Sequence, residues 1–447
     1  MSAAGERQAA LAALLAAAKR AGADAADAVW VDSESLSVTR RLGKIEQLER
    51  SESRDIGLRV FVGRAVAAVS SNAAERDGLD ALAARAVAMA RVVPEDRFAG
   101  LAETVTPPDD AGALELDDGA TPDVAALLAR AAAAEEAVLA TPGITNSDGA
   151  EAGHSRTTAC LATSAGFFGE VTRGGHSVSV TAMAGSGTEM QRDYDFHAAA
   201  FAADLEDPEA LGRNAAARAL RRLNPTRPRT ASLPVVFDPR VAGSLVSHLA
   251  GAVNGAAIAR GTSFLKDRMG DQIFPTGVTI IDDPRRRRGM RSRTYDGEGV
   301  PTAPRALVKD GSLASWLLDW RSARQLGLAS TGHAARGTTG GPSPSATNLY
   351  MCAGTESADA LIGAVALGIY VTELMGMGVN LLTGDYSRGA SGFMIRDGRI
   401  AEPVAEFTIA GTLPEMWRDL AVADDLTFRQ GTDAPTLRVA RMTIAGA

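Results

Sequence analysis

The sequence predicts an α+β fold, in which an N-terminal helix-meander-helix unit and a mixed α/β lobe precede a C-terminal, mainly antiparallel β domain with few helices. Helix-like and strand-like segments come in runs rather than in strict alternation, which favours α+β over α/β. Residues 224–229, Asn-Pro-Thr-Arg-Pro-Arg, are typical of a linker. At about 100–200 residues per domain, 447 residues predict two or three domains. We place them at 1–225, with sub-lobes at about 1–105 and 121–225, and at 231–447.

The chain is expected to open with a helix and several short strands. Glu6–Ala21 is rich in strong helix formers and carries leucines on one face, and Gly22 is a plausible helix stop. The segments Ala28–Val31, Ser35–Arg41 and Ile45–Arg50 are short, β-prone and separated by polar residues or glycine.

A hairpin and a second helix complete the first sub-lobe. Ile56–Val62 and Arg64–Ser71 alternate apolar and polar residues around Gly63, which predicts a β-hairpin. Asp77–Val93 returns to helical periodicity and stops before Pro94.

The second sub-lobe follows a loop. Pro94–Gly119 is rich in proline, aspartate and glycine and contains the pair Pro107-Pro108. Thr121 and Pro122 are expected to be the N-cap and first residue of a helix that runs to about residue 139. Residues 144–200 are β-prone, with glycine and serine turns.

The remaining elements surround the linker. Leu205–Leu223 is expected to be helical, and beyond the linker Leu233–Phe237 is a predicted strand and Pro239–Val253 a predicted helix. Glycine-punctuated strands then continue to the end, and Gly327–Pro344 is a predicted loop.

Charge and apolar patterning argue against nucleic-acid and membrane binding. The chain has 46 basic and 54 acidic residues, a net charge of −8, and only four of the basic residues are lysines. No apolar run approaches the roughly 18–20 residues of a membrane helix, and Glu6 with Lys19-Arg20 disfavours a signal peptide. Cys160 and Cys352 cannot form a disulfide framework. A soluble, cytoplasmic protein is expected, and its arginine excess indicates a compositional bias.

The common catalytic motifs are absent. A Walker A loop and a GxSxG nucleophile elbow are missing, and no two of the five histidines lie within one helical turn, as HExxH would require. No metal is therefore expected on this chain alone. The run Arg285–Arg288, extended by Arg291 and Arg293, is either a solvated loop or a surface for phosphate or an acidic partner.

Two C-terminal blocks carry a resemblance to a known family. Residues 376–393 have the sequence GMGVNLLTGDYSRGASGF, and residues 406–413 have the sequence EFTIAGTL. Together they resemble the PmbA/TldE branch of the TldD/PmbA family. The supporting blocks are Ile56–Phe61, Gly261–Ser263, Tyr295–Thr302 and Asp310–Leu313.

The resemblance implies a two-subunit zinc protease, TldD with TldE, that acts on unfolded or extended peptides. The TldD subunit carries zinc on an HExxxH helix, with a cysteine supplied from near its C-terminus. The same motif set on the helix upstream of Gly261 places Ser247 and Ala252 at the histidine positions and His248 at the glutamate position. No cysteine follows Gly411. The resemblance thus implies a subunit that is not catalytic on its own, with zinc expected only in a TldD-type partner.

The glycine-rich block is also the candidate substrate channel or partner interface, and a tightly turned sheet core is the alternative interpretation. The candidate residues are Asn380, Thr383, Asp385, Tyr386, Ser387 and Arg388. The expected partners are a TldD-type subunit, or otherwise a second copy in a homodimer, and an unfolded peptide. Two other functions stay open: a stand-alone homodimeric hydrolase with an unrecognised site, and a regulatory protein-binding factor of the kind once described as modulating DNA gyrase.

Overall fold

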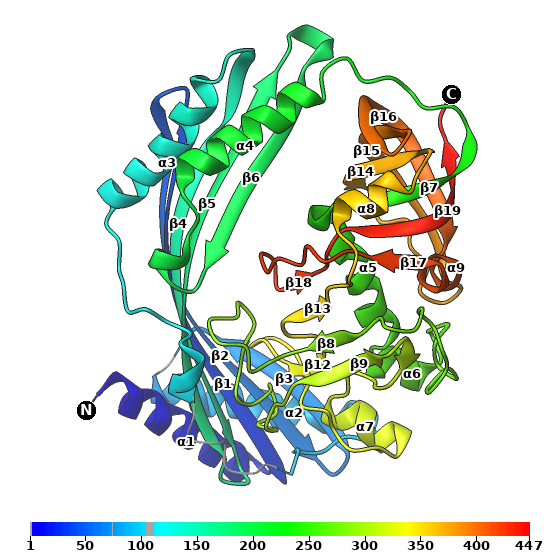
Figure 1. Cartoon of the computed structure of the whole chain (residues 1–447). Coiled ribbons are helices and arrows are strands. Elements are labelled where there is room, and N and C mark those ends of the chain that lie inside the picture. Colours follow the sequence, from blue (N-terminus) through cyan, green and yellow to red (C-terminus); the bar gives the residue numbers. More distant parts are fainter. Residues whose placement is uncertain (1, 74, 104–110) are drawn as a thin grey trace.

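A six-stranded antiparallel sheet forms the N-terminal half of the chain in the computed structural model, which describes residues 2–73, 75–103 and 111–447. The strand order β3-β2-β1-β4-β5-β6 joins the first meander and the later strands in one sheet (Figure 1). The strands are β1 Ala25–Arg41, β2 Lys44–Val62, β3 Ala65–Ser71, β4 Ile144–Thr163, β5 Phe168–Ala184 and β6 Gln191–Ala199. The α+β prediction is confirmed, and so is the β2–β3 hairpin, which turns at Gly63 with φ +60°.

The first two strands are longer than predicted. Ala28–Val31 and Ser35–Arg41 both belong to β1, and Ile45–Arg50 and Ile56–Val62 both belong to β2, so the predicted breaks between them are wrong. Polar residues 32–34 stay extended because β1 pairs there with β2 on one side and β4 on the other. Paired backbone satisfies its own hydrogen bonds whatever the side chains are.

Four helices cover one face of this sheet. They are α1 Ala3–Ala21, α2 Arg76–Ala90, α3 Val124–Leu139 and α4 Pro208–Arg221. Trp30 and Val38 lie an even number of residues apart on β1 and so point to the same face. Trp30 packs in the core beneath α1 and α2, whereas Val38 packs in a second core beneath α3 and α4. The opposite face is left for the C-terminal half.

Helix ends follow the expected chemistry, with one correction. Gly22 ends α1 in the left-handed region at φ +104°, as predicted. The cap of α3 is Asp123, whose carboxylate accepts from the Ala126 amide, rather than Thr121, and Pro122 lies before the helix. Asp and Thr are comparable N-cap residues, so sequence alone did not separate the two positions.

Two sheets build the C-terminal half. The larger has the order β16-β15-β14-β7-β19-β17, and a further β16–β19 pairing joins five of its strands in a closed ring. The smaller has the order β10-β9-β8-β13-β18, and β11 and β12 form a separate pair. The larger sheet consists of β7 Ala231–Phe237, β14 Leu367–Met375, β15 Asp385–Arg396, β16 Arg399–Thr412, β17 Leu420–Val422 and β19 Leu437–Ala445. The other strands are β8 Ile280–Asp282, β9 Arg305–Lys309, β10 Ser312–Leu313, β11 Ala334–Ala335, β12 Ser343–Pro344, β13 Leu349–Met351 and β18 Thr432–Asp433.

Short helices accompany these sheets. They are α5 Pro239–Ala252, α6 Gly255–Arg260, α7 Trp320–Leu326, α8 Ala358–Gly363 and α9 Leu413–Arg418. The first of them, α5, begins at the Asp238 cap and buries a stripe at helical spacing, formed by Ala242, Leu245, Val246, Leu249 and Ala252. Because this stripe faces the core, the opposite side of α5, which includes Ser247, is the side exposed to solvent.

The predicted loops are largely irregular. Gly327–Pro344 contains only the short pair β11–β12, and within Pro94–Gly119 residues 104–110, including Pro107-Pro108, lie outside the described residues. Over the described residues, every helix is too short or too polar to cross a membrane. The domain boundaries stay a prediction.

Candidate functional site

The helix that aligns with the zinc motif is α5, and its motif positions hold no set of metal ligands. Ser247 is exposed, and its hydroxyl donates to the Gly243 carbonyl at 3.1 Å. Ala252 is fully buried in the core and has no donor atom. Zinc in a protease needs three protein ligands and an open position, so these residues do not fit the metal.

His248, at the glutamate position, packs against Tyr386 of β15. The two ring centroids are 5.9 Å apart at an interplanar angle of 72°, an edge-to-face contact. Burial, together with the nearby Arg388 guanidinium, lowers the pKa of His248 to about 4. The imidazole is therefore neutral at physiological pH.

The loop from Gly376 to Gly384 folds back onto the start of β15. A Cβ at Gly378 would lie 2.1 Å from the Ser387 carbonyl oxygen, and the Ser387 amide donates to the Gly378 carbonyl at 2.7 Å. Gly384 has φ +89° and packs against Pro414. Glycine at these positions permits a close approach and a left-handed turn that other residues disfavour.

The six candidate channel residues differ in exposure, which alternates along the start of β15 from Asp385 to Arg388. The exposed ones are Asn380, Thr383, Asp385 and Ser387. The Thr383 hydroxyl donates to the Asp385 carboxylate at 2.6 Å, and the Asn380 side chain accepts from the Leu382 amide at 2.9 Å. Tyr386 is buried and Arg388 is half-buried. The block therefore contributes Tyr386 to the buried core and a set of polar side chains to the protein surface.

Three buried polar atoms of this region lack hydrogen-bond partners among the described residues: His248 Nε2, Tyr386 Oη and Arg388 Nε. Burial raises the pKa of the Tyr386 phenol, so it stays protonated and able to donate. Buried polar groups are normally satisfied. The three unsatisfied atoms thus belong to side chains of one region, where His248 contacts Tyr386 and the Arg388 charge acts on both.

We compared the chain with known families and structures. The pattern of the PmbA/TldA metallopeptidase C-terminal domain matches residues 230–446, that of the central domain residues 117–223, and that of domain 1 residues 26–90. The chain belongs to the PmbA/TldD family. Metalloprotease PmbA of Escherichia coli O157:H7 is 36% identical over 95% of this chain and 92% of its own.

Solved structures of this family have the same fold. A putative modulator of DNA gyrase from Bacteroides thetaiotaomicron has a TM-score of 0.88 at 25% identity, covering 98% of this chain and 99% of its own. TldE from Thermococcus kodakarensis has a TM-score of 0.84 at 21% identity over 98% of this chain and all of its own, a likeness of fold alone.

A buried charge network joins the family's domain 1 to its C-terminal domain, and sequence reasoning did not find it. Arg59 donates to Asp27 at 2.9 Å and lies 3.4 Å from Glu298, and Arg336 also pairs with Asp27. Arg59 and Glu298 each lie in a block that supported the resemblance. The signal available in the sequence was Arg59, a charged residue within the otherwise apolar block Ile56–Phe61. Nothing in the sequence indicates that this block contacts the block that contains Glu298.

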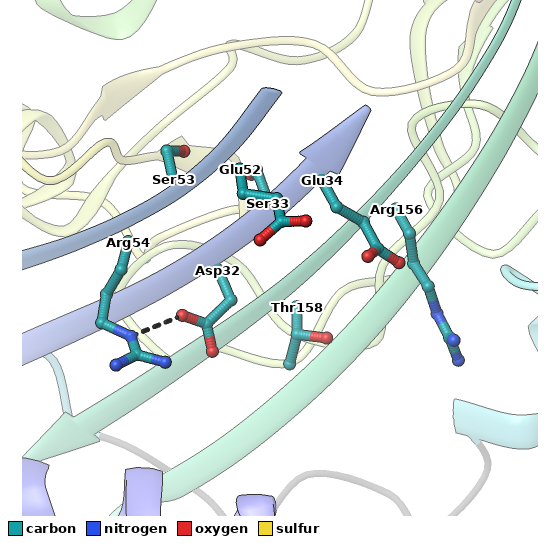
Figure 2. Close-up of a pocket in the computed structure, with 8 residues that line it drawn as sticks. All are labelled: Asp32, Ser33, Glu34, Glu52, Ser53, Arg54, Arg156 and Thr158. Carbon is teal, nitrogen blue, oxygen red and sulfur yellow. Dashed lines mark hydrogen bonds and ion pairs between the residues drawn. The ribbon is translucent and has the colours of Figure 1, made fainter. Parts of the chain in front are cut away.

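A hollow lies on the N-terminal sheet, over β1, β2 and β4 (Figure 2). Figure 2 shows Arg54 donating to Asp32, at 3.0 Å, beside Glu34 and Glu52. Glu34 and Glu52 are directly opposed across the strands, an unfavourable like-charge pair. Ion pairing satisfies Asp32, so this hollow has fewer unsatisfied groups than the α5 region.

Two side chains of the arginine-rich segment, Arg286 and Arg288, bind other residues of the protein. Arg288 pairs with Asp204 at 2.9 Å and Glu115 at 2.7 Å, and Arg286 stacks over Phe428 at 3.5 Å. The ion pairs of Arg288 link the two halves of the chain, whereas Arg286 and Phe428 both lie in the C-terminal half. Neither interpretation of the run predicts such internal contacts.

Proposed function

We propose that this chain is a TldE/PmbA-like subunit of a TldD–TldE-type zinc metalloprotease that degrades or processes unfolded peptides. In this proposal it is not catalytic alone, holds no zinc, and shapes the substrate channel with its partner. One observation carries the proposal: the motif positions of α5 hold no set of metal ligands, yet its His248 packs against Tyr386 near Arg388, and all three side chains have buried polar atoms without partners among the described residues.

The absence of zinc on this chain is supported by the character of all three motif positions. A serine bonded to its own helix, a buried alanine and a neutral histidine provide at most one good ligand. Over the described ranges no cluster of three or more His, Cys, Asp or Glu side chains is arranged to hold a metal ion. The zinc, with its activated water, is expected on the HExxxH helix of the partner.

The channel role is supported by the surface beside this site. Met375, Met377 and Leu382 of the β14–β15 connection are 47%, 90% and 57% exposed. Large apolar side chains gathered on a surface are typical of binding sites. Exposed polar groups at Thr383 and Asp385 adjoin them, so the surface offers apolar contact and hydrogen bonds to an extended peptide or to the partner subunit.

The other two functions find less support. A stand-alone hydrolase needs a nucleophile or metal, and the α5 region provides neither. A regulatory factor that binds an acidic protein or nucleic acid through the arginine run would need free cations there, but Arg287 and Arg288 are paired with Glu115 and Arg286 is stacked on an aromatic ring.

Co-expression with a TldD-type partner tests the proposal. We expect a stable complex on size exclusion, zinc in the complex but not in this chain alone, and cleavage of unfolded casein only by the complex. Met377→Asp should weaken assembly or cleavage. Val92→Asp is the matched control, because Val92 is 82% exposed and lies just after α2, at the end of the domain 1 match.

Two results would overturn the proposal. Stoichiometric zinc on the purified chain, or chelator-sensitive cleavage by it alone, would contradict the non-catalytic role. A partner that cleaves peptide at full rate without this chain would contradict the shared channel.

A further inference from the structure

A cavity of about 440 Å³ lies where the C-terminal half covers the sheet face opposite the helices. That volume is in the range of small-molecule sites, roughly 300–1,000 Å³. One wall comes from β1, β4 and β5, and the other from two C-terminal segments, residues 293–297 and 335–336. It is built from different elements than the α5 site.

The sheet wall of this cavity is mostly apolar, with Thr157 and Arg173 as its polar members. Val29 lies opposite Leu161, and Val31 opposite Ala159, which in turn faces Val171 on β5. Residues directly paired across strands present their side chains to the same face. These five side chains therefore form a continuous aliphatic wall.

The facing wall is cationic. The Arg336 side chain is 1% exposed and its Nε has no hydrogen-bond partner in the described part of the chain. Arg293 donates through Nη1 to the Ala334 carbonyl at 3.0 Å, but its Nε and Nη2 are likewise buried and unpartnered. A third cation, Arg173 of β5, lies on the sheet side of the cavity and, among the described residues, donates to the backbone carbonyls of Met290 and Ser292, both at 2.5 Å.

The neighbouring carboxylates are occupied elsewhere. Asp27 is shared by Arg59 and Arg336. Asp296 accepts from the backbone amides of Glu298, Val300 and Ala334. Burial lowers the pKa of Arg293 in spite of the attraction of Asp296 and Asp282, and burial together with the Arg293 charge lowers the pKa of Arg173. Burying such charges is costly unless an anion compensates them.

We propose that this cavity binds a small organic anion, a carboxylate on a short apolar body. The carboxylate accepts from Arg293 Nε and Nη2 and from Arg336 Nε, and the apolar body packs on Val29, Val31, Leu161 and Val171. A guanidinium edge matches a carboxylate in geometry and charge. Because the two walls come from different domains, the bound anion stabilises the contact between them. The proposal does not depend on the protease assignment.

Calorimetric titration and thermal unfolding with hexanoate test the proposal on the full chain. Hexanoate should bind saturably and raise the unfolding temperature, whereas 1-hexanol and acetate, which each lack one half of the recognised structure, should bind at least about tenfold more weakly. Arg293→Met should reduce hexanoate affinity at least about tenfold without lowering the unfolding temperature of the free protein, because it replaces by an apolar chain a buried charge whose desolvation outweighs its attraction to Asp296 and Asp282.

Two further variants keep the test decisive. Ala159→Glu, at an exposed position of the cavity wall, introduces a competing carboxylate and should abolish hexanoate binding even if Arg293→Met misfolds. Arg54→Met, 54% exposed on the same sheet, should change nothing. No saturable hexanoate binding by the wild type, unchanged binding by Ala159→Glu or folded Arg293→Met, or equal affinity for hexanoate and acetate would overturn the proposal.

Discussion

The titration of Glu298 should make the stability of the protein depend on pH. Its side chain is 2% exposed, and burial raises its pKa from 4.5 to about 7, against the opposing attraction of Arg59. A carboxyl with a higher pKa in the folded chain holds its proton more tightly there, so stability falls as pH rises from about 4.5 to about 7. The loss is of the order of 3 kcal/mol.

Glu298→Gln should remove this loss while keeping an acceptor for the Trp320 amide. The free energy of unfolding by urea, measured at several pH values across that window, should decline for the wild type and stay flatter for the variant. Glu52→Gln, 63% exposed on β2, should keep the wild-type decline. Equal slopes for wild type and Glu298→Gln would contradict the assignment.

A substitution at Tyr386 can distinguish a functional role of its hydroxyl from a structural one. Its buried hydroxyl has no partner in the described structure, so Tyr386→Phe should change the free energy of unfolding by less than about 1 kcal/mol. If the hydroxyl contacts peptide or partner, cleavage by the co-expressed complex should fall about tenfold or more.

Tyr370→Phe is the matched control with the opposite signature. Its hydroxyl donates to Asp238 at 2.8 Å, so its loss should cost about 1–3 kcal/mol of stability and leave cleavage by folded complex unchanged. Full cleavage by Tyr386→Phe would show that the phenol is only part of the core.

The β14–β15 connection is the element on which the candidate site depends. With only 2.1 Å between a Cβ at Gly378 and the Ser387 carbonyl oxygen, Gly378→Ala must move backbone, and we expect a cost of about 1–3 kcal/mol. Hydrogen exchange should quicken at the Ser387 amide and its neighbours. Gly337→Ala, where a Cβ meets nothing within 4 Å, should be neutral, and unchanged protection in Gly378→Ala would contradict the packing argument.

Element boundaries show how far the sequence could predict this fold. The Gly63 hairpin and the helix ending at Gly22 were predictable because local chemistry determines both. The length of β1 was not, because residues 32–34 stay extended through pairing with strands far away in sequence.

The candidate site was predictable in position but not in arrangement. Aligning α5 with the zinc motif and choosing the 376–393 block located both elements. The contact between His248 and Tyr386, which brings the two together, depends on tertiary packing. The same holds for the Arg59–Glu298 pair, whose members lie 239 residues apart.

Arginine has a structural role at the scale of the whole molecule. The excess was interpreted as compositional bias, but several arginines join the two halves: Arg288 to Asp204, Arg240 to Asp193, Arg429 to Glu206, Arg321 to Asp96 and Arg59 to Glu298. The exposed pairs among these contribute little individually, whereas Arg240–Asp193 and the network around Asp27 are largely buried. Because Asp27 binds two arginines and is joined through Arg59 to Glu298, we expect docking of the halves to depend most on its network.

Asp27→Asn tests this dependence. Asp27 is 1% exposed, and although burial opposes it, Arg336 and Arg59 hold the pKa of its carboxyl below the usual value. Removing its charge leaves two buried guanidiniums short of a counter-charge, which should cost about 3–5 kcal/mol. Calorimetry should show one unfolding transition for the wild type and two for the variant, because each half keeps its own core while their contact is weakened. Asp32→Asn, whose carboxylate is 27% exposed and pairs with Arg7 and Arg54, should cost no more than about 1 kcal/mol and keep a single transition. A single transition with wild-type stability in Asp27→Asn would mean that apolar packing alone, not this network, holds the halves together.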